Sequence, residues 1–406
     1  MSAPSLLFRQ ATVLVGGADW TPRRDMDLSI RGGRIVALGR DLPALASALE
    51  IPARHLLLLP AFHNGHTHSP EAMARGRAPM SRQAEWLRHA YAGGTDALDD
   101  AALQQAVGSA AIDLVRSGTA RVTDHFRQIP TRSAAVRAAA TAWRATGLGA
   151  RIAVMLRDRD LPPGVPAPPL PALLDLAAAC LTDPSVGLGP SAPQRCTDGL
   201  LHGLGRLARD AGSFLHMHVC ETAADADACR TLYGESAIAH LDRLGLLGPA
   251  TELAHCVHVD EDDLRRLAAT GTVMVHNPAA NLRLGSGVAP VARARALGVR
   301  LRLGTDGAGS NDSQSMLDAV RLACLLPRNA LPEDDWPLPA DALAMATDGA
   351  RLEPDAVADL LSFDLRAPAF LGATDDELLP RLVLAAREAD LTHVLCRGRL
   401  LQGTGA

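Results

Sequence analysis

Lysine is missing from this sequence of 406 residues, so all 40 of its basic residues are arginine. The absence excludes chemistry that depends on a lysine amine, such as a Schiff base with a carbonyl substrate or the lysine of a phosphate-binding P-loop. It also excludes a metal centre that needs a carboxylated lysine. A genome with arginine-rich codon usage explains the same absence without a functional cause, and the two explanations are compatible.

Aromatic residues are scarce, at 3% of the chain, which argues against an extensive aromatic cage around a substrate. No apolar run reaches the length of a membrane span, and the sequence starts without a signal-peptide pattern. The net charge of −5, without a basic cluster, argues against nucleic acid and anionic membranes as partners. Seven cysteines without a CxxC pair indicate reduced thiols. We therefore expect a cytoplasmic protein, and the sequence allows a homodimer.

The middle of the chain, residues 59–350, has the pattern of an α/β protein. Apolar, β-branched runs alternate there with alanine-rich segments of helical periodicity. The expected barrel strands, the first of which lies just before this region, are 56–59, 120–123, 151–156, 186–189, 213–218, 252–255, 273–276 and 300–303. Eight strands with intervening helices over this length predict a (β/α)8 TIM-like barrel.

Both ends of the chain have a different pattern, in which short strands alternate with turn residues. We expect strands at 11–15, 27–30, 33–38, 358–364 and 392–400. Their alternation and modest length are typical of a small β-sandwich. We therefore predict a discontinuous β-sandwich domain from residues 1–58 and 351–406, beside a catalytic barrel domain from residues 59–350.

A histidine pair follows the first expected barrel strand. His66 and His68 are two residues apart, and on an extended chain such residues point to the same side. One strand end can therefore present two imidazoles to one point, as at the C-terminal mouth of a metal-binding barrel. Histidine pairs at strand ends also occur without a metal, so this motif is weak by itself.

Further strand ends strengthen the metal prediction. Metal-capable residues follow several expected strands, at His218, His255, His276 and Asp306. All of them lie at C-terminal ends, where barrel active sites are found. Three histidines and one aspartate suit Zn²⁺ or Fe²⁺, and such an ion lowers the pKa of a coordinated water toward about 7. Glu221 is three residues past His218 and is free to exchange protons with that water.

These motifs resemble those of the amidohydrolase superfamily, in its mononuclear-metal deaminase branch, which includes S-adenosylhomocysteine, adenosine, guanine and cytosine deaminases and s-triazine hydrolases. The matching segments read HTH (66–68), HVCE (218–221), HCVH (255–258), HNPAANLRLG (276–285) and GTDGAGS (304–310). The resemblance covers nearly the whole chain. It implies one divalent metal ion, zinc or ferrous iron, with the ligands His66, His68, His218 and Asp306. The lack of lysine agrees, because the binuclear branches bridge their metals with a carboxylated lysine.

The implied activity is that of a hydrolytic deaminase, which releases ammonia from an amino-substituted N-heterocycle such as a purine, pyrimidine, pterin or triazine. Glu221 would be the proton shuttle, His255 would polarise the water and the substrate, and Asp306 would also accept a hydrogen bond from the attacking water. Two alternatives stay open. One is a triazine-type hydrolase with an alkylamine or chloride leaving group, and the other is an inactive barrel that serves as a binding or assembly subunit.

Five residues are candidates for contacts with the substrate. Glu85 and Arg157 resemble residues that S-adenosylhomocysteine deaminases use for ribose hydroxyls and for a carboxylate. Ser191 and Gln194 lie after the fourth strand, where the nucleoside branch places a histidine against the purine. That departure argues against an adenosine-like substrate. His276 either lines the pocket or only caps the turn before the proline that follows.

The remaining histidines have less specific interpretations. His216 shares the parity of His218 and competes with it for the ligand position. His63 lies near the ligands and is expected to be a supporting or structural residue. The histidines that fall on expected helices or loops, with surface or packing roles, are His89, His125, His202 and His240.

Overall fold

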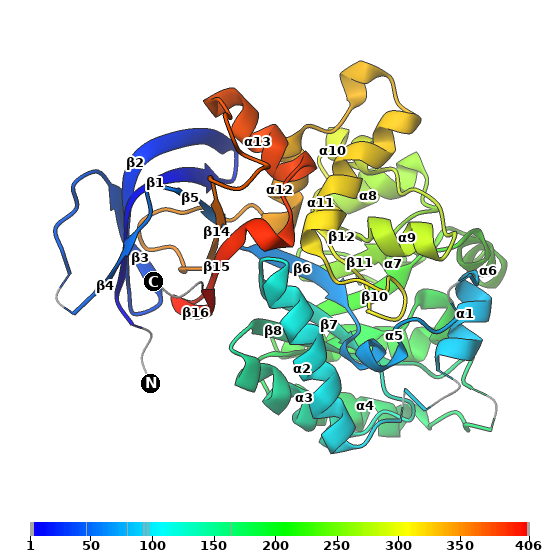
Figure 1. The fold of residues 1–406 in the computed structure, drawn as a ribbon. Coiled ribbons are helices and arrows are strands. Elements are labelled where there is room, and N and C mark those ends of the chain that lie inside the picture. Colours follow the sequence, from blue (N-terminus) through cyan, green and yellow to red (C-terminus); the bar gives the residue numbers. More distant parts are fainter. Residues whose placement is uncertain are drawn as a thin grey trace.

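The computed structural model describes residues 4–45, 47–78, 80–91, 94–95, 97–162 and 164–403. Its larger part is a parallel barrel whose eight strands follow one another in chain order (Figure 1). The strands are β6 (Phe62–Thr67), β7 (Thr119–Phe126), β8 (Gly149–Leu156), β9 (Val186–Pro190), β10 (Leu215–Val219), β11 (Thr251–His255), β12 (Val273–His276) and β13 (Arg300–Leu303). The Asp306 N–H, just past β13, donates to the His66 carbonyl at 2.9 Å and so ties the last strand to the first. The predicted (β/α)8 architecture is confirmed.

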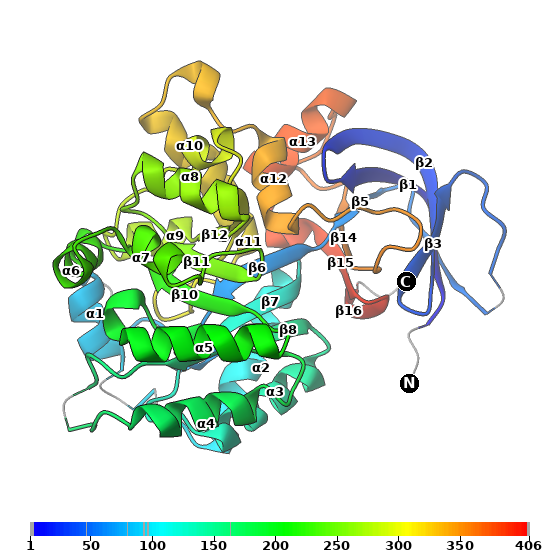
Figure 2. The same ribbon diagram turned by 180° about the vertical axis from the view of Figure 1, so that it is seen from behind.

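Helices surround the barrel, as Figures 1 and 2 show from opposite sides. The larger outer helices are α2 (Asp100–Arg116), α3 (Ser133–Thr146), α4 (Leu170–Cys180), α5 (Asp198–Asp210), α7 (Ala237–Arg243), α8 (Glu261–Thr270), α11 (Met316–Leu325) and α12 (Pro339–Thr347). In α2, Leu103, Val107 and Ala110 recur at helical spacing and are buried in the main core. None of the helices formed by the described residues combines the length and apolar character needed to cross a bilayer.

A second set of helical segments follows the C-terminal ends of the barrel strands and surrounds the mouth of the barrel. They are η1 (Ser69–Ala74) and α1 (Gln83–Ala90) after β6, η2 (Pro193–Arg195) after β9, α6 (Ala223–Tyr233) after β10 and α9 (Pro278–Arg283) after β12. Because the loops at this end are separate from the packed barrel, they can carry substrate contacts without disturbing the core.

Strands from the two ends of the chain form a second sheet beside the barrel (Figures 1 and 2). Its strands are β1 (Leu6–Gly16), β2 (Asp19–Arg31), β3 (Arg34–Gly39), β4 (Leu49–Pro52), β5 (Leu56–Pro60), β14 (Leu360–Asp364), β15 (Leu391–Cys396) and β16 (Arg399–Gly403). The order is β16-β15-β14-β5-β1-β2-β3, with β4 also paired to β1. Strands from both chain ends, such as β5 and β14, are hydrogen-bonded neighbours, and the sheet has its own apolar core.

Two strand predictions are wrong. The run Leu56–Leu59 was expected to be the first barrel strand, but it lies in β5 of the small sheet, and the barrel strand is β6. Periodicity cannot separate the two cases, because a run buried on both faces is continuously apolar in either sheet. The segment 392–400 forms two strands instead of one. Arg397 and Gly398 adopt left-handed φ angles of +49° and +69°, which close a tight hairpin between β15 and β16.

The division into domains at 58/59 and 350/351 stays a prediction. Strand β5 carries the small sheet to Pro60, just beyond the first predicted boundary. Residues 1–3 and 404–406, the outermost parts of the predicted sandwich domain, lie outside the described residues.

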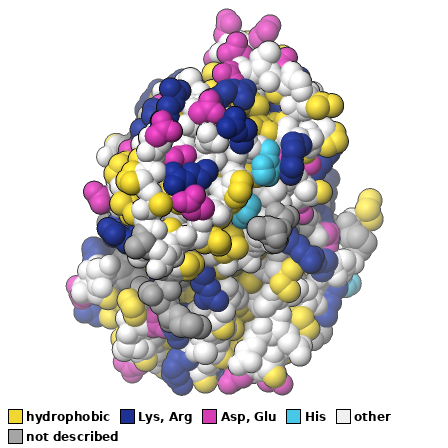
Figure 3. Space-filling view, turned by 60° about the vertical axis from the view of Figure 1, so that its left-hand side comes forward, with side chains coloured by type: hydrophobic (Ala, Val, Ile, Leu, Met, Phe, Trp, Pro, Cys, Tyr) yellow, Lys and Arg dark blue, Asp and Glu magenta, His cyan; other side chains and the backbone are white. Residues whose placement is uncertain are grey.

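On the face shown in Figure 3, arginine and acidic side chains lie intermixed, with hydrophobic side chains among them.

Candidate metal centre and active site

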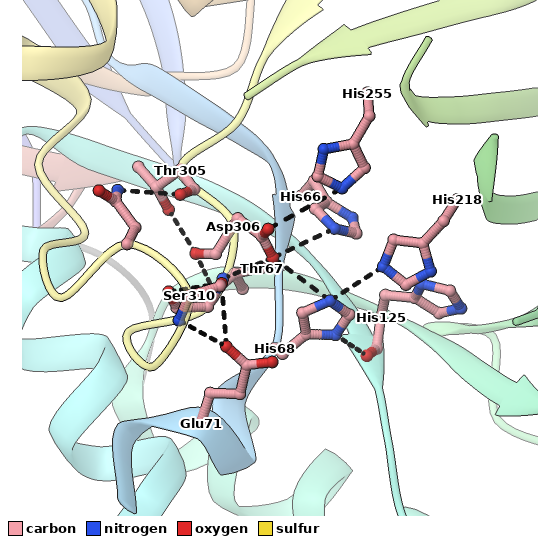
Figure 4. A network of polar contacts seen from close by, with 12 residues as sticks. His66, Thr67, His68, Glu71, His125, His218, His255, Thr305, Asp306 and Ser310 are labelled. Atoms are coloured by element: carbon pink, nitrogen blue, oxygen red, sulfur yellow. Dashed lines mark hydrogen bonds and ion pairs between the residues drawn. The ribbon is translucent and has the colours of Figure 1, made fainter. Parts of the chain in front are cut away.

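Four histidines and one aspartate converge at the C-terminal end of the barrel. His66 and His68 come from the end of β6, His218 from β10 and His255 from β11, and Asp306 follows β13. Figure 4 shows these side chains directed toward one another. All of them are buried except His218, which is partly exposed. The C-terminal strand ends therefore bring together residues that are up to 240 positions apart, from 66 to 306.

The distances between these side chains suit a single metal ion. The Nε2 atoms of His68 and His218 lie 3.1 Å apart, and Asp306 Oδ1 lies 3.3 Å from His68 Nε2 and 3.4 Å from His66 Nε2. Two ligands of a tetrahedral zinc, with bonds of about 2.0–2.1 Å, are about 3.3 Å apart. His66 Nε2 is buried and has no hydrogen-bond partner among the described residues. A divalent ion would satisfy this nitrogen, so the donor set fits the predicted cofactor.

Backbone carbonyls orient two of the imidazoles. His68 Nδ1 lies 2.6 Å from the His125 carbonyl, and His218 Nδ1 lies 2.8 Å from the Ser191 carbonyl. A carbonyl can only accept, so each Nδ1 carries the hydrogen and each Nε2 keeps a lone pair toward the centre. This is how proteins commonly orient metal-binding histidines.

The backbone is strained around the same centre. His255 and Asp306 have φ angles of +73° and +64°, and Cys220 and Cys256, beside Glu221 and His255, both have φ of +47°. Non-glycine residues in this left-handed region cost of the order of 1–3 kcal/mol each and cluster at functional sites. Here the sharp turns after β10, β11 and β13 direct the following side chains into the barrel mouth.

Glu221 lies at the edge of this centre, beside His255. Its Oε2 accepts a hydrogen bond from Gln83 Nε2 at 2.5 Å and lies 3.8 Å from His255 Nε2. Burial raises the pKa of Glu221, and the nearby Asp306 carboxylate adds to that effect. A carboxyl group with a raised pKa can hold a proton closer to neutral pH, as a proton shuttle requires.

His255 is held between two carboxylates. Its Nδ1 lies 2.8 Å from Asn281 Oδ1, and its Nε2 lies 3.8 Å from both Glu221 Oε2 and Asp306 Oδ2. Burial lowers the pKa of His255, but the carboxylates of Glu221 and Asp306 outweigh it, so its pKa is raised. Burial opposes ionisation of Asp306 too, yet the surrounding imidazoles hold the pKa of that carboxyl below its usual range.

Two connected cavities lead to this centre. The inner one, of about 30 Å³, is lined by His68, Glu71, Ser191, His218, Glu221 and Asp306, among others. The outer one, of about 1120 Å³, is large enough for a small organic ligand, for which pockets of roughly 300–1,000 Å³ are usual. Its charged lining includes Arg82, Arg88, Arg127, Arg157 and Arg195, against Asp160 and Asp225. The mouth is therefore predominantly cationic.

The structure brings only some of the predicted substrate residues to these cavities. Ser191 lines the inner cavity, and its buried hydroxyl has no hydrogen-bond partner among the described residues. Arg157 and Gln194 line the outer cavity, where Gln194 Nε2 donates to an aspartate on α6. Glu85 is not brought there: its exposed carboxylate faces His89 on the outside of α1, at 3.9 Å. His276 is buried at the end of β12 and is absent from the described lining of both cavities.

Sequence reasoning missed several residues of the site. Gln83 lies on α1 and reaches Glu221, and Glu71 is a buried carboxylate that lines the inner cavity. Glu71 accepts hydrogen bonds from the Tyr91 hydroxyl and from the N–H and hydroxyl of Ser310. A Cβ on Gly307 would lie 2.1 Å from the Glu71 carboxylate, so this glycine leaves room for it. The glycines of the GTDGAGS segment were the available signal for such a close approach.

Of the histidines expected on helices or loops with surface or packing roles, two are buried. His125 lies in β7, where its ring is 4.6 Å from that of His218. His240 is buried on α7 and stacks on Tyr233, with ring centroids 3.5 Å apart. By contrast, His89 is exposed, as expected. His216 is engaged on both ring nitrogens, by His66 at Nε2 and by a glutamate at Nδ1.

Comparisons with known proteins agree with this geometry. The model of the Amidohydrolase family matches residues 57–401. The 5-methylthioadenosine/S-adenosylhomocysteine deaminase of Moorella thermoacetica is 32% identical over 371 residues, which cover 87% of this chain and 84% of that protein. The 5'-deoxyadenosine deaminase of Methanothermobacter thermautotrophicus is 31% identical, with coverages of 93% and 89%. The solved structure of atrazine chlorohydrolase from Arthrobacter aurescens, complexed with zinc, superposes with a TM-score of 0.89 at 23% identity, with coverages of 98% and 95%.

Proposed function

Since the chain belongs to the amidohydrolase family, we propose that it is a metal-dependent aminohydrolase that releases ammonia from an amino-substituted N-heterocycle. The observation that carries the proposal is the position of Glu221, beside His255 and in the lining of the inner cavity together with His68, His218 and Asp306. The names of the relatives, which are deaminases of adenosine-type compounds, support the reaction class. After strand β9 this chain has Ser191 and Gln194 where the nucleoside branch places a histidine. Since the adenosine-type relatives match most of the chain, this difference is a weaker argument against a purine substrate than the sequence suggested.

The proposed metal ligands are His66, His68, His218 and Asp306, and the proposed ion is one Zn²⁺, with Fe²⁺ as the alternative. When bound, a divalent ion at this position lowers the pKa of a coordinated water toward about 7 and so supplies a nucleophile near neutral pH. Burial lowers the pKa of His66 and of His218 well below the usual value, which favours the neutral form that a metal ligand needs.

The protein's own groups would handle the protons. Glu221 is placed to take a proton from the attacking water and to pass it to a ring nitrogen of the substrate. It would then carry a second proton, from the new hydroxyl group of the substrate, to the departing amine, which leaves as ammonia. Gln83, which donates to Oε2 of Glu221, fixes the direction of this carboxylate. His255, held at Nδ1 by Asn281, directs its Nε2 to the space between Glu221 and Asp306 and would polarise the reacting groups there.

We also infer an acidic or strongly polar group at the far end of the substrate. The outer cavity is lined by more arginines than acidic residues, and guanidinium groups pair well with carboxylates and phosphates. Arg157→Ala should lower kcat/KM for an acidic substrate by about 10–150-fold, which corresponds to about 1.5–3 kcal/mol for a hydrogen bond to a charged group. For an analogue without the acidic group, Arg157→Ala should change kcat/KM little. Arg144→Ala, an exposed arginine that pairs with Asp183, is the matched control.

A panel of amino-substituted purines, pyrimidines, pterins and triazines, assayed by ammonia release, tests the reaction. Release of ammonia from none of them, with chloride or alkylamine released from triazines, would favour the triazine-hydrolase alternative. A chain that binds no metal and turns over nothing would be the inactive binding subunit. The cytoplasmic location and the homodimer stay predictions. Light scattering of the purified protein would measure its assembly state.

A further inference from the structure

His66 differs from the other proposed histidine ligands in the groups that hold its ring. Its Nδ1 is 2.7 Å from His216 Nε2, and His216 Nδ1 is 3.0 Å from Glu252 Oε2. All three side chains are buried, and the two rings are stacked at a 15° interplanar angle. The ring of His66 is therefore held by a chain of side chains, whereas backbone carbonyls hold His68 and His218.

The charge of Glu252 sets the direction of the hydrogen bonds from Glu252 through His216 to His66. Glu252 Oε1 accepts from Arg302 Nη1 at 2.7 Å and from Arg151. Burial would raise the pKa of Glu252, but Arg302, His216 and Arg151 hold it well below its usual range, so the group is a carboxylate. A carboxylate only accepts, and the His216 Nδ1 must therefore carry the hydrogen.

The remaining hydrogens follow from that assignment. A neutral imidazole with a hydrogen on Nδ1 has an acceptor at Nε2, so His216 Nε2 accepts from His66 Nδ1. His66 then has no hydrogen on Nε2, the atom that lies 3.4 Å from Asp306 Oδ1 and makes no hydrogen bond within the described part of the chain. We propose that Glu252 is a positioning residue, which acts through His216 to present the lone pair of His66 Nε2 to the metal. The proposal rests on the proposed metal site.

The surrounding barrel is built to admit this network. A Cβ on Gly65 would lie 2.6 Å from Arg302 Cδ, so the glycine beside His66 lets the arginine cross the barrel to Glu252. Arg302 is also held by Asp348 Oδ2, at 2.8 Å from its Nη2. Asp348 thus shares Arg302 with Glu252 but makes no hydrogen bond to His216 among the described residues.

Glu252→Gln tests the proposal, because it keeps the shape of the side chain and reverses the direction of the hydrogen bonds through His216. The amide oxygen would face the two arginines, so the amide N–H would face His216 Nδ1. His216 would then donate from Nε2, and His66 would carry its hydrogen on Nε2, toward the metal. We expect zinc affinity to fall by roughly 10–100-fold, the usual effect of losing such a supporting partner. Competition with a chromophoric chelator measures the affinity, and ¹⁵N NMR of histidine-labelled, metal-free protein shows the tautomer of His66.

Asp348→Asn is the matched control. It removes a carboxylate from the same arginine, so it should lower the melting temperature but leave zinc affinity and the His66 tautomer unchanged. An equal loss of zinc affinity in both variants would overturn the proposal, because the effect would then come from a weakened barrel. Wild-type affinity and an unchanged tautomer in Glu252→Gln would overturn it as well. A wild-type protein that binds no zinc contradicts the proposed function, whereas the tautomer still tests the role of Glu252.

Discussion

At the scale of single residues, Glu221 separates proton transfer from metal binding. Glu221→Gln keeps the shape of the side chain, and its amide oxygen can still accept from Gln83. We expect metal content to be unchanged and turnover to fall by about 10²–10⁴-fold, the usual contribution of general acid–base catalysis. Ammonia release and elemental analysis of the same preparation give both results. Near-wild-type turnover of Glu221→Gln would contradict the role of Glu221 as proton shuttle. It would favour a leaving group such as chloride, which needs no protonation.

The two histidines of β10 make a second prediction at this scale. His218 directs Nε2 to the centre, whereas His216 supports His66 from behind. His218→Ala should therefore lose its stoichiometric metal. His216→Ala should still bind about one metal ion per chain at saturating zinc, though more weakly. The opposite result, with metal retained only by His218→Ala, would show that His216 is the ligand.

At the scale of elements, Asp27 on β2 joins separate parts of the small sheet. Its carboxylate accepts from the backbone N–H groups of Gln10 and Leu42, at 2.9 and 3.0 Å, and from Arg9 at 2.8 Å. Burial opposes its ionisation, but these donors outweigh it and lower its pKa. Asp27→Asn should reduce the free energy of unfolding at pH 7 by about 1.5–3 kcal/mol, as for hydrogen bonds to a charged group.

The difference in free energy of unfolding between wild type and Asp27→Asn should depend on pH with a definite sign. A lowered folded-state pKa stabilises the protein above the unfolded value, about 3.9 for aspartate, and this contribution is lost as the pH falls further. Urea unfolding of both proteins should therefore give a constant difference from pH 7 to about pH 4.5, which narrows toward pH 3. A difference that persists undiminished at pH 3 would contradict the role of the charge.

At the scale of the whole molecule, the metal should stabilise the fold. The proposed ligands come from β6, from β10 and from the segment after β13, so an ion would connect the first, middle and last parts of the barrel. An ion that binds only the folded protein stabilises it by about 2.7 kcal/mol when its free concentration is 100 times Kd. Chelation should lower the melting temperature, and zinc should restore it. His218→Ala should show no such shift, and identical melting of loaded and chelated wild type would contradict the site.

Much of this architecture could be predicted from the sequence because local patterns carry it. Apolar runs at regular spacing indicate the barrel strands, and the alternation of extended chain places His66 and His68 on one side of β6. The same reasoning failed at Leu56–Leu59, since a run buried on both faces looks alike in either sheet. Because barrel sites lie at the C-terminal ends of the strands, the order of strands and polar residues in the sequence was enough to group the proposed ligands.

Only the tertiary structure decided which distant groups meet. Gln83 reaches Glu221 across 138 positions of sequence, and Glu252 reaches His66 through His216. Glu85, two residues from Gln83 on the same helix, points to solvent instead. No local pattern distinguishes these outcomes, because a buried polar side chain is directed by the partners that replace its water, and those partners come from other strands. Sequence thus determined which chemical groups stand at the barrel mouth, while packing determined their orientation and hydrogen bonding.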